Sequence, residues 1–297
     1  MATQILCIAG PTASGKSSRA VEIALMGFVN PSSNDGFTKP IMGEIISVDS
    51  RQVYHGLDIG TEKITREEMC GIPHHLIDIR DANETYSAGD FVTDSTRLIT
   101  EISARGKLPI LVGGTHFYFD ALLSGLPTGI DANPALREEL EKLTTEDLYA
   151  RVRSMDARRA TELDPKNRRR LIRALEIIDS LGSVPSRNSL IVPIGQNKEY
   201  IVEWVVINPS REELRTRIEV RLHSALERGL IDEVRRVRKE VGDARLNELG
   251  LEYKIVGEYL RGEMSNTECL TFKLSAKLWQ YARRQKAWLR KLGHPMS

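Results

Sequence analysis

Residues 10–17, Gly-Pro-Thr-Ala-Ser-Gly-Lys-Ser, form a complete phosphate-binding loop. The apolar residues 5–9 before it predict a buried strand, and residues 18–25 after it predict a helix. In that setting the backbone N–H groups of the loop converge on phosphate oxygens at the start of the helix. Lys16 would add a positive charge between phosphates, and the Ser17 hydroxyl would be a ligand for Mg²⁺. A glycine-rich turn that merely caps a helix is the alternative, but the strand–loop–helix order favours a site for a diphosphate or triphosphate.

The length and composition are those of a globular protein. The chain has 297 residues, 41% of them hydrophobic and 28% charged, which allows one large domain or two modest ones. It contains no apolar run near the roughly 20 residues of a membrane span and no signal-peptide pattern, so we expect a cytoplasmic protein without membrane contact. Cys7, Cys70 and Cys269 are too scattered for a disulfide framework or metal site, and we expect them to fill the core.

The net charge of +1 conceals an asymmetry between the two halves of the chain. Residues 1–150 carry 12 Lys and Arg against 21 Asp and Glu, whereas residues 151–297 carry 30 against 20. Nine basic residues fall within 151–173, and seven fall within 273–291, where Trp279, Tyr281 and Trp288 lie among them. Either segment alone would be typical of a solvated helix face. The two together favour a surface for a polyanion such as a nucleic acid.

Alternating strand and helix patterns predict an α/β fold, a P-loop parallel sheet flanked by helices. We expect strands at residues 4–9, 44–48, 75–79, 109–112 and 200–207, and a helix at residues 88–105. A helical insertion domain is expected at residues 127–198, with helical periodicity at 133–143, 145–157 and 168–181. The catalytic core would then comprise residues 1–126 and 199–297, helical from residue 210 onward with breaks near Gly242 and Gly262. The composition of residues 30–36 predicts a surface loop.

Polar residues follow two of the expected strands, at the edge where ligands bind in open parallel sheets. Asp49 follows the second strand; it could take a proton from a nucleophile or bind Mg²⁺ through water, or it could simply cap a helix. Gly113-Gly114-Thr115 follow the fourth strand, where they would permit a substrate to approach closely or form a plain tight turn. His74-His75 lack the spacing of a metal site, and we interpret them as structural.

Taken together and in order, these motifs resemble the tRNA dimethylallyltransferase (tRNA isopentenyltransferase) family. The resemblance spans nearly the whole chain, and its strings are diagnostic in combination. Besides the phosphate loop they are SVDSRQVY at 47–54, GLDIGTEK at 56–63, GIPHHLID at 71–78, YSAGDF at 86–91, LVGGTHFY at 111–118, DPKNRRRLIRALE at 164–176 and YARRQKAWLR at 281–290.

The resemblance implies a reaction, its partners and its site residues. A dimethylallyl group would pass from dimethylallyl diphosphate to the exocyclic amine of the adenosine 3′-adjacent to the anticodon of a tRNA. Catalytic roles would fall to Asp49 as general base and to Thr12, Lys16 and Arg221 at the diphosphate. A dry apolar slot would hold the five carbons. The diphosphate-binding residues would be Gly10, Pro11, Thr12, Ala13, Ser14, Gly15, Lys16, Ser17, Arg217 and Arg221, with Mg²⁺ on Ser17. The tRNA-binding residues would be Asp49, Ser50, Arg51, Gln52, Thr115, Arg137, Arg169, Arg170, Leu171, Ile172 and Arg173.

Two segments depart from the family pattern. The loop at residues 26–43 is longer than expected, and Gly250-Leu251-Glu252-Tyr253-Lys254 stands where Gly-Tyr followed by Lys or Arg is expected.

Three further functions stay open. An adenylate isopentenyltransferase would share the phosphate-binding loop and Asp49 but would not need the basic insertion. The phosphate loop would also suit a small-molecule P-loop kinase, and the basic segments a non-catalytic nucleic-acid-binding module. We expect a monomer.

Overall fold

The computed structural model describes residues 2–28, 41–126, 133–185, 194, 197 and 199–290. Its contacts divide the chain into two compact units. The larger unit comprises Met1–Leu122 and Asn197–Ser297, and the smaller unit comprises Leu123–Gln196. The predicted surface loop at residues 30–36 lies outside the described residues. At the ends of that segment, Phe28 and Ile41 pair in an isolated antiparallel bridge.

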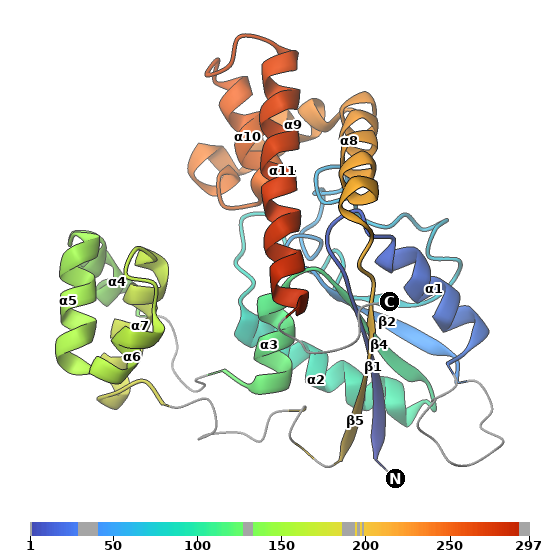
Figure 1. Cartoon of the computed structure of the whole chain (residues 1–297), viewed down its shortest axis with the longest axis horizontal. Coiled ribbons are helices and arrows are strands. Elements are labelled where there is room, and N and C mark those ends of the chain that lie inside the picture. Colours follow the sequence, from blue (N-terminus) through green and yellow to red (C-terminus); the bar gives the residue numbers. More distant parts are fainter. Residues whose placement is uncertain are drawn as a thin grey trace. The chain divides into compact units, whose positions relative to one another are not determined.

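A parallel five-stranded sheet forms the centre of the larger unit, in the order β3-β2-β4-β1-β5 (Figure 1). The strands are β1 (Thr3–Ala9), β2 (Gly43–Val48), β3 (His74–His75), β4 (Leu108–Gly113) and β5 (Tyr200–Val206). In register, Ile8 of β1 lies between Val112 of β4 and Val205 of β5. Both β2 and β4 are buried along their whole length, as expected for strands covered on both faces. This architecture confirms the predicted α/β fold class.

One predicted strand is wrong in its extent. We expected a strand at residues 75–79, but β3 contains only His74 and His75. Leu76 and Asp78 have φ angles of 62° and 52°, in the left-handed region, which a strand cannot accommodate. The apolar residues that suggested a longer strand instead belong to a turn, where the Ile79 N–H donates to the Val53 carbonyl.

Helices α1 (Lys16–Met26), α2 (Ala88–Ala104) and α3 (His116–Ser124) follow β1, β3 and β4 along the chain. Helix α1 buries Ala20, Val21, Ile23 and Ala24 against a sheet face that includes Leu6, Ile8, Ile45 and Ile110. Helix α2 also packs against β1, β2 and β4, and no residue of α2 belongs to the α1 cluster. Because successive strand residues point to opposite faces, α1 and α2 cover opposite faces of the sheet.

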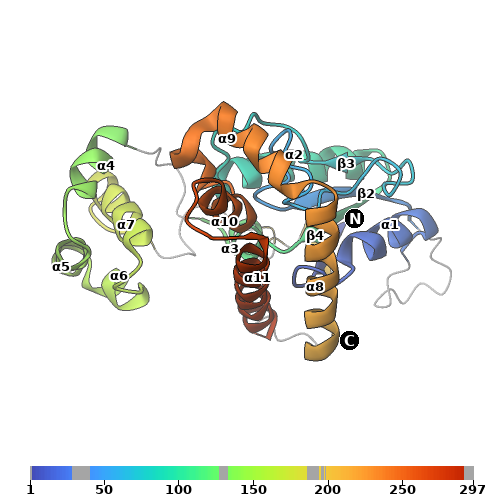
Figure 2. The same cartoon turned by 90° about the horizontal axis from the view of Figure 1, so that it is seen from above.

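Four helices complete the larger unit: α8 (Arg211–Glu227), α9 (Leu230–Leu246), α10 (Leu251–Leu260) and α11 (Thr267–Leu289). Figures 1 and 2 show α8 and α11 side by side, and contacts also join α9 to α10 and α10 to α11. The predicted breaks are confirmed, because Gly242 leaves the helical conformation within α9 and Gly262 follows the end of α10. Within the described part of the chain, no helix has the length and apolar character needed to span a membrane.

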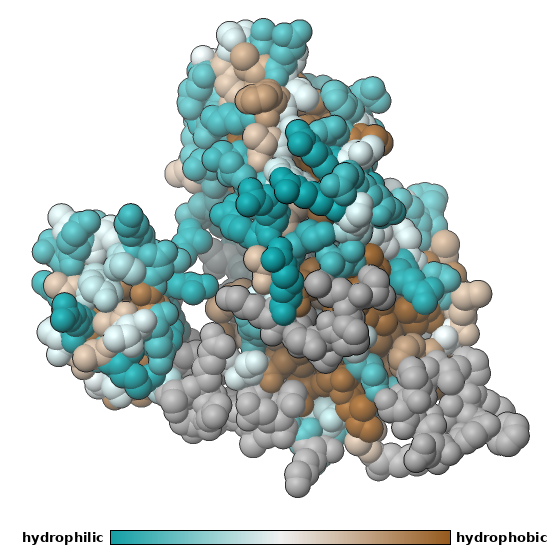
Figure 3. All heavy atoms as spheres, in the orientation of Figure 1, coloured by the Kyte–Doolittle hydropathy of each residue, from teal (hydrophilic) through white to brown (hydrophobic). Residues whose placement is uncertain are grey.

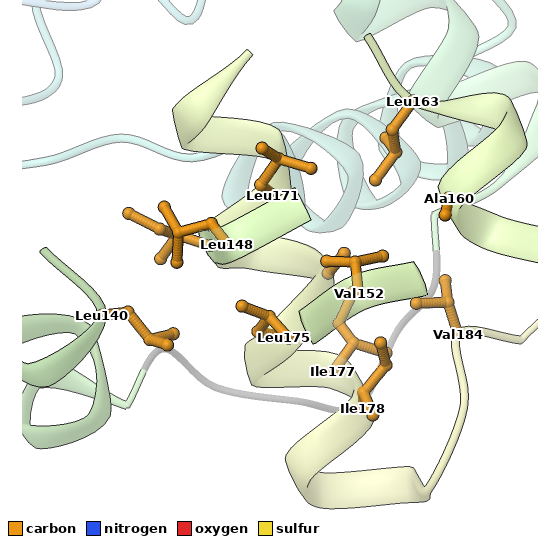
Figure 4. Packing of buried hydrophobic residues seen from close by; sticks show 12 residues of the cluster. Leu140, Leu148, Val152, Ala160, Leu163, Leu171, Leu175, Ile177, Ile178 and Val184 are labelled. Carbon is orange, nitrogen blue, oxygen red and sulfur yellow. The ribbon is translucent and has the colours of Figure 1, made fainter. Parts of the chain in front are cut away.

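The described residues of the smaller unit form four helices: α4 (Pro134–Glu141), α5 (Thr145–Met155), α6 (Ala157–Glu162) and α7 (Arg168–Leu181). Leu148 and Val152 of α5 pack with Leu171, Leu175 and Ile178 of α7 in its core (Figure 4). Their spacing of three or four residues places them on one face of each helix. We expected one helix at residues 145–157, but α5 ends at Met155, and the Asp156 carboxylate accepts the Arg159 N–H to begin α6.

The cysteines only partly follow the prediction. Cys7 is buried in β1, as expected for a core residue, whereas Cys70 and Cys269 are exposed. Cys70 lies in a turn with a φ angle of 50°, and Cys269 lies in the first turn of α11. Their flanking sequences lack the apolar periodicity of the core, so burial was a poor prediction for these two thiols.

Candidate active site

A cavity of about 420 Å³ opens in the larger unit at the carboxyl ends of β1, β2 and β4. These strands are neighbours in the sheet, so the segments that follow them meet at one edge. Most of the predicted site residues line this cavity: Thr12, Ala13, Ser14, Gly15, Lys16, Ser17, Asp49, Ser50, Arg51, Gln52, Thr115 and Arg221. Gly10, Pro11 and Arg217 are not among the lining residues.

The phosphate-binding loop presents the start of α1 to this cavity. Gly15 precedes α1 with a φ angle of 86°, a left-handed conformation that favours glycine. Ala13 has a φ angle of 61°, which is uncommon for a residue with a side chain. No side chain caps α1, and its first turn holds no acidic residue. The first N–H groups of the helix are therefore available to an anion in the cavity.

Lys16 is the cation at the bottom of the loop. Its Nζ donates to the Pro11 carbonyl across 3.3 Å. Burial and, to a lesser extent, the Arg221 charge lower the pKa of Lys16 to about 8, while the Asp49 carboxylate acts in the opposite direction. A bound diphosphate would place negative charge beside Lys16 and Arg221 and so stabilise the protonated amine.

Two arginines of α8 reach the loop, and they do different things. Arg221 lines the cavity, and its Nη1 donates to the Thr12 Oγ1 at 2.7 Å. Arg217 donates from Nη1 to the Ser14 carbonyl at 3.1 Å and pairs with Glu213 at 2.6 Å. Arg221 therefore lies where it can contact the substrate. Arg217 instead holds the backbone of the loop through the Ser14 carbonyl.

Asp49 combines the two roles that the sequence left open. Its Oδ1 accepts the backbone N–H groups of Arg51 at 2.8 Å and Gln52 at 3.3 Å, which is a capping role. No described residue donates a hydrogen bond to its Oδ2. One oxygen therefore fixes the carboxylate, and the other can accept a proton in the cavity. The Ser50 N–H donates to Thr115 Oγ1 at 3.1 Å, which ties this turn to the segment after β4.

The far wall of the cavity contains residues that the sequence motifs did not assign to the site. Gln285 of α11 accepts the Thr12 N–H at 2.8 Å and donates to the Gly114 carbonyl at 3.0 Å, joining two of the strand ends. Tyr281 lies one turn earlier on α11, and Glu252 lies at the start of α10. Burial raises the pKa of Glu252, and the Arg221 charge opposes this rise. Tyr281 and Gln285 fall within the string at residues 281–290, which carried no site assignment, and nothing in the sequence distinguished Glu252.

A smaller apolar pocket adjoins the cavity. The two share Thr12, Gly60, Glu62, Arg221 and Glu252 in their walls. The rest of the smaller pocket is mainly aliphatic, and its aliphatic residues are Ile59, Ile218, Leu222, Ala225, Leu230 and Leu278. The smaller pocket holds only about 20 Å³, close to the space of one water molecule, so an apolar group of a few carbons would lie in the cavity with one side against this aliphatic wall.

The remaining predicted residues lie in the smaller unit and fall into three groups. Arg169 and Arg170 are exposed and have no ion pair with any described residue. Arg137 and Arg173 both pair with the buried carboxylate of Glu176, Arg137 at 2.7 Å and Arg173 at 3.2 Å.

Leu171 and Ile172, which we expected to contact tRNA, are instead buried, with 0% and 4% of their surfaces exposed. Their side chains stabilise the core of the unit, because they occupy the apolar face of α7.

The strand–loop–helix order and the cavity at the strand ends define a P-loop α/β protein. The model of the IPP transferase family matches residues 52–292. The chain is 37% identical over 289 residues to tRNA dimethylallyltransferase 1 of Citrifermentans bemidjiense, covering 97% of this chain and 89% of that one. It is also 37% identical to the tRNA dimethylallyltransferase of Streptococcus sanguinis, with 98% and 90% covered.

Solved structures agree with these sequence relatives. The tRNA isopentenylpyrophosphate transferase of Bacillus halodurans superposes with a TM-score of 0.67 at 36% identity, covering 97% of this chain and 87% of that one. A eukaryotic dimethylallyltransferase acting on tRNA gives a TM-score of 0.77 at 28% identity, with 97% and 70% covered. The chain belongs to the IPP transferase family, which confirms the predicted resemblance.

Proposed function

We propose that this protein transfers a dimethylallyl group from dimethylallyl diphosphate to the exocyclic amine of the adenosine 3′-adjacent to the anticodon of a tRNA. One observation carries the proposal: Lys16, Arg221 and Asp49 line one cavity, beside an aliphatic pocket that shares Arg221. An anion site, a base and an apolar pocket are the three elements that prenyl transfer requires. The named relatives, which match over nearly the whole chain, support tRNA as the acceptor.

The residues present fit a magnesium diphosphate. Mg²⁺ prefers oxygen ligands and is usually held by one or two protein oxygens together with substrate phosphates. The Ser17 hydroxyl and the Asp49 carboxylate line the same cavity, and the described residues contain no cluster of three or more His, Cys, Asp or Glu side chains suited to an all-protein site. When bound, Mg²⁺ would neutralise charge on the departing diphosphate. Ser17 would hold it, with the phosphate oxygens completing its coordination.

The chain's own groups account for the bond changes. The bond from carbon to the diphosphate oxygen breaks as the bond from the adenine nitrogen to that carbon forms. Lys16, Arg221 and the N–H groups of the loop stabilise the negative charge that develops on the diphosphate. Asp49 accepts the proton that the amine loses, and its Oδ2 is the oxygen not used by backbone donors. The aliphatic side chains beside the diphosphate would keep water away from the allylic carbon, which water would otherwise capture.

The tRNA would be bound by exposed basic residues. Five of the nine basic residues in the segment 151–173 are exposed without an ion-pair partner among the described residues: Arg151, Arg153, Lys166, Arg169 and Arg170. The face of the smaller unit seen in Figure 3 is largely hydrophilic. Such unneutralised cations suit the phosphate backbone of an RNA. A free nucleotide would not require them, and this favours tRNA over AMP as the acceptor.

One incubation tests the proposal. Isotopically labelled dimethylallyl diphosphate is supplied with Mg²⁺ and either unmodified tRNA or AMP. We expect label in the tRNA and none in AMP. Label in AMP alone would identify an adenylate isopentenyltransferase. Label in neither, together with ATP-dependent phosphorylation of a small acceptor in a parallel reaction supplied with ATP, would identify a kinase.

A further inference from the structure

Glu233 on α9 is a buried carboxylate outside the reaction cavity. Only 3% of the residue is exposed, yet it faces no arginine or lysine partner among the described residues. It instead accepts three successive backbone N–H groups, from Asp58 at 3.1 Å, Ile59 at 2.8 Å and Gly60 at 2.9 Å. The Tyr253 hydroxyl donates a fourth hydrogen bond at 2.6 Å. Four donors to one buried carboxylate hold this loop in a single conformation.

The loop held by Glu233 forms a wall of the active site. Gly60, Thr61 and Glu62 line the reaction cavity. A side chain at Gly60 would place its Cβ 2.7 Å from the Tyr253 ring, so only glycine permits the packing of loop on ring. The segment Gly250–Lys254, which departs from the family pattern, thus supplies Tyr253, which holds this loop together with Glu233.

Glu62 connects the anchored loop to the diphosphate site. Its carboxylate lies 3.6 Å from Arg221 and 2.6 Å from Arg228. Arg221 in turn donates to Thr12 of the phosphate-binding loop. On the opposite side, Gln52 donates to the carbonyls of Thr61 and Glu62 at 3.2 and 3.3 Å. The position of Arg221 therefore depends on a loop whose own position depends on Glu233.

From these contacts we propose that Glu233 and Tyr253 are positioning residues for the diphosphate site: they fix the loop 58–62, and through Glu62 they hold Arg221 in its binding orientation. Glu233 lies outside the reaction cavity, and Tyr253, which lines it, acts here through its hydroxyl on Glu233. The proposal rests on the proposed function for its prenyl substrate, but the predicted effect on diphosphate binding holds for any ligand of this site.

The test uses Glu233→Gln and Tyr253→Phe in the full chain. Glutamine keeps the shape but turns an amide donor toward backbone N–H groups, and phenylalanine removes one donor while keeping the ring. We expect Glu233→Gln to weaken the binding of inorganic diphosphate by about tenfold or more, the cost of losing one hydrogen bond from Arg221 to the charged ligand. Tyr253→Phe should show a smaller loss in the same direction. The Kd for tRNA should change less than about twofold.

Glu240→Gln, an exposed substitution on the same helix, is the matched control and should leave diphosphate binding unchanged. A double-mutant cycle separates positioning from simple loss of stability. If Glu233 acts through Glu62, the effects of Glu233→Gln and Glu62→Gln on diphosphate affinity will be far less than multiplicative.

Lowered thermal stability with unchanged diphosphate affinity in both variants, or fully multiplicative effects, would overturn the proposal. A parent protein that binds diphosphate but transfers no dimethylallyl group would instead count against the proposed function, and the positioning role could still be read from the diphosphate affinities.

Discussion

Arg221 and Asp49 in the reaction cavity and the exposed Arg169 and Arg170 of the smaller unit are organised in opposite ways. In the cavity Arg221 and Asp49 are held in place by neighbours: Arg221 contacts Thr12 and Glu62, and Asp49 is fixed by two backbone N–H groups. In the helical unit Arg169 and Arg170 project from the first turn of α7 without an ion-pair partner among the described residues. Substrate binding in the cavity should therefore depend on the positions of its charged groups. RNA binding by the helical unit should depend on the number of its exposed charges.

Asp49→Asn should give the largest effect. Asparagine keeps an acceptor oxygen for the Arg51 and Gln52 N–H groups, but it cannot take up the proton of the amine. We expect kcat to fall by about 10²–10⁴-fold, the range for loss of general acid–base catalysis, with little change in the Kd for tRNA. Single-turnover kinetics and filter binding measure the two quantities. A rise in the KM for tRNA alone would make Asp49 a positioning residue.

A matched pair of arginines tests the sensitivity of the cavity to geometry. Arg221 and Arg217 lie one turn apart on α8, and only Arg221 lines the cavity. Arg221→Ala should lower kcat/KM for dimethylallyl diphosphate by about 10²–10³-fold, as for loss of one stabilising donor. Arg217→Ala removes the same charge, and its effect should be at least tenfold smaller. Equal losses in the two variants would show that net charge, not position, decides diphosphate binding.

The lowered pKa of Lys16 makes a pH prediction. In the free protein Lys16 carries its charge below a pKa of about 8 and loses it as the pH rises. Because diphosphate binds the charged form, affinity should be full below pH 8 and should fall by up to about tenfold for each pH unit above it. Calorimetry with inorganic diphosphate measures this dependence. Lys16→Arg should remove it, since arginine stays protonated; a fall that persists in Lys16→Arg would assign the titration to another group.

The sequence predicted which segments line the cavity better than it predicted the residues that hold those segments in place. The phosphate-binding loop, Asp49 and Thr115 were found because each follows a strand, and parallel topology brings strand ends to one edge. Glu233 and Gln285 could not be found in this way. Their contacts, to Gly60 and Thr12, join residues 173 and 273 positions apart in the chain. A local sequence pattern does not indicate contacts between residues so far apart.

Within the helical unit the limits of prediction were different. The run of arginines at 168–170 predicted a basic surface, but it did not show which arginines are already neutralised. Arg168 is bound by Glu141 and by carbonyls at the end of α4, leaving Arg169 and Arg170 without an ion pair among the described residues. The periodicity of α7 was visible in the sequence, and it should have assigned Leu171 and Ile172 to the core rather than to tRNA binding.

The smallest effect is expected for the helical unit. Each phosphate contact made by a basic residue adds about 0.7 to 0.9 to the slope of log affinity against log salt. Replacing both Arg169 and Arg170 with alanine should therefore reduce the salt slope of tRNA binding by up to about 1.8, with the KM for dimethylallyl diphosphate nearly unchanged. The control replaces Arg97 and Arg235, which are exposed but paired with acidic neighbours, and should leave the slope as it was. An unchanged slope in both double variants would assign Arg169 and Arg170 to an ordinary solvated surface.

The most direct test of the central claim follows a single group from substrate to product. The protein is incubated with dimethylallyl diphosphate, Mg²⁺ and an anticodon stem-loop that has adenosine directly after the anticodon, and the RNA is weighed by mass spectrometry. We predict one added dimethylallyl group on this RNA and none on the same stem-loop with guanosine at that position. A parallel reaction supplied with ATP should show no phosphoryl transfer. Unmodified RNA together with sustained ATP-dependent phosphorylation of a small acceptor would contradict the proposed function.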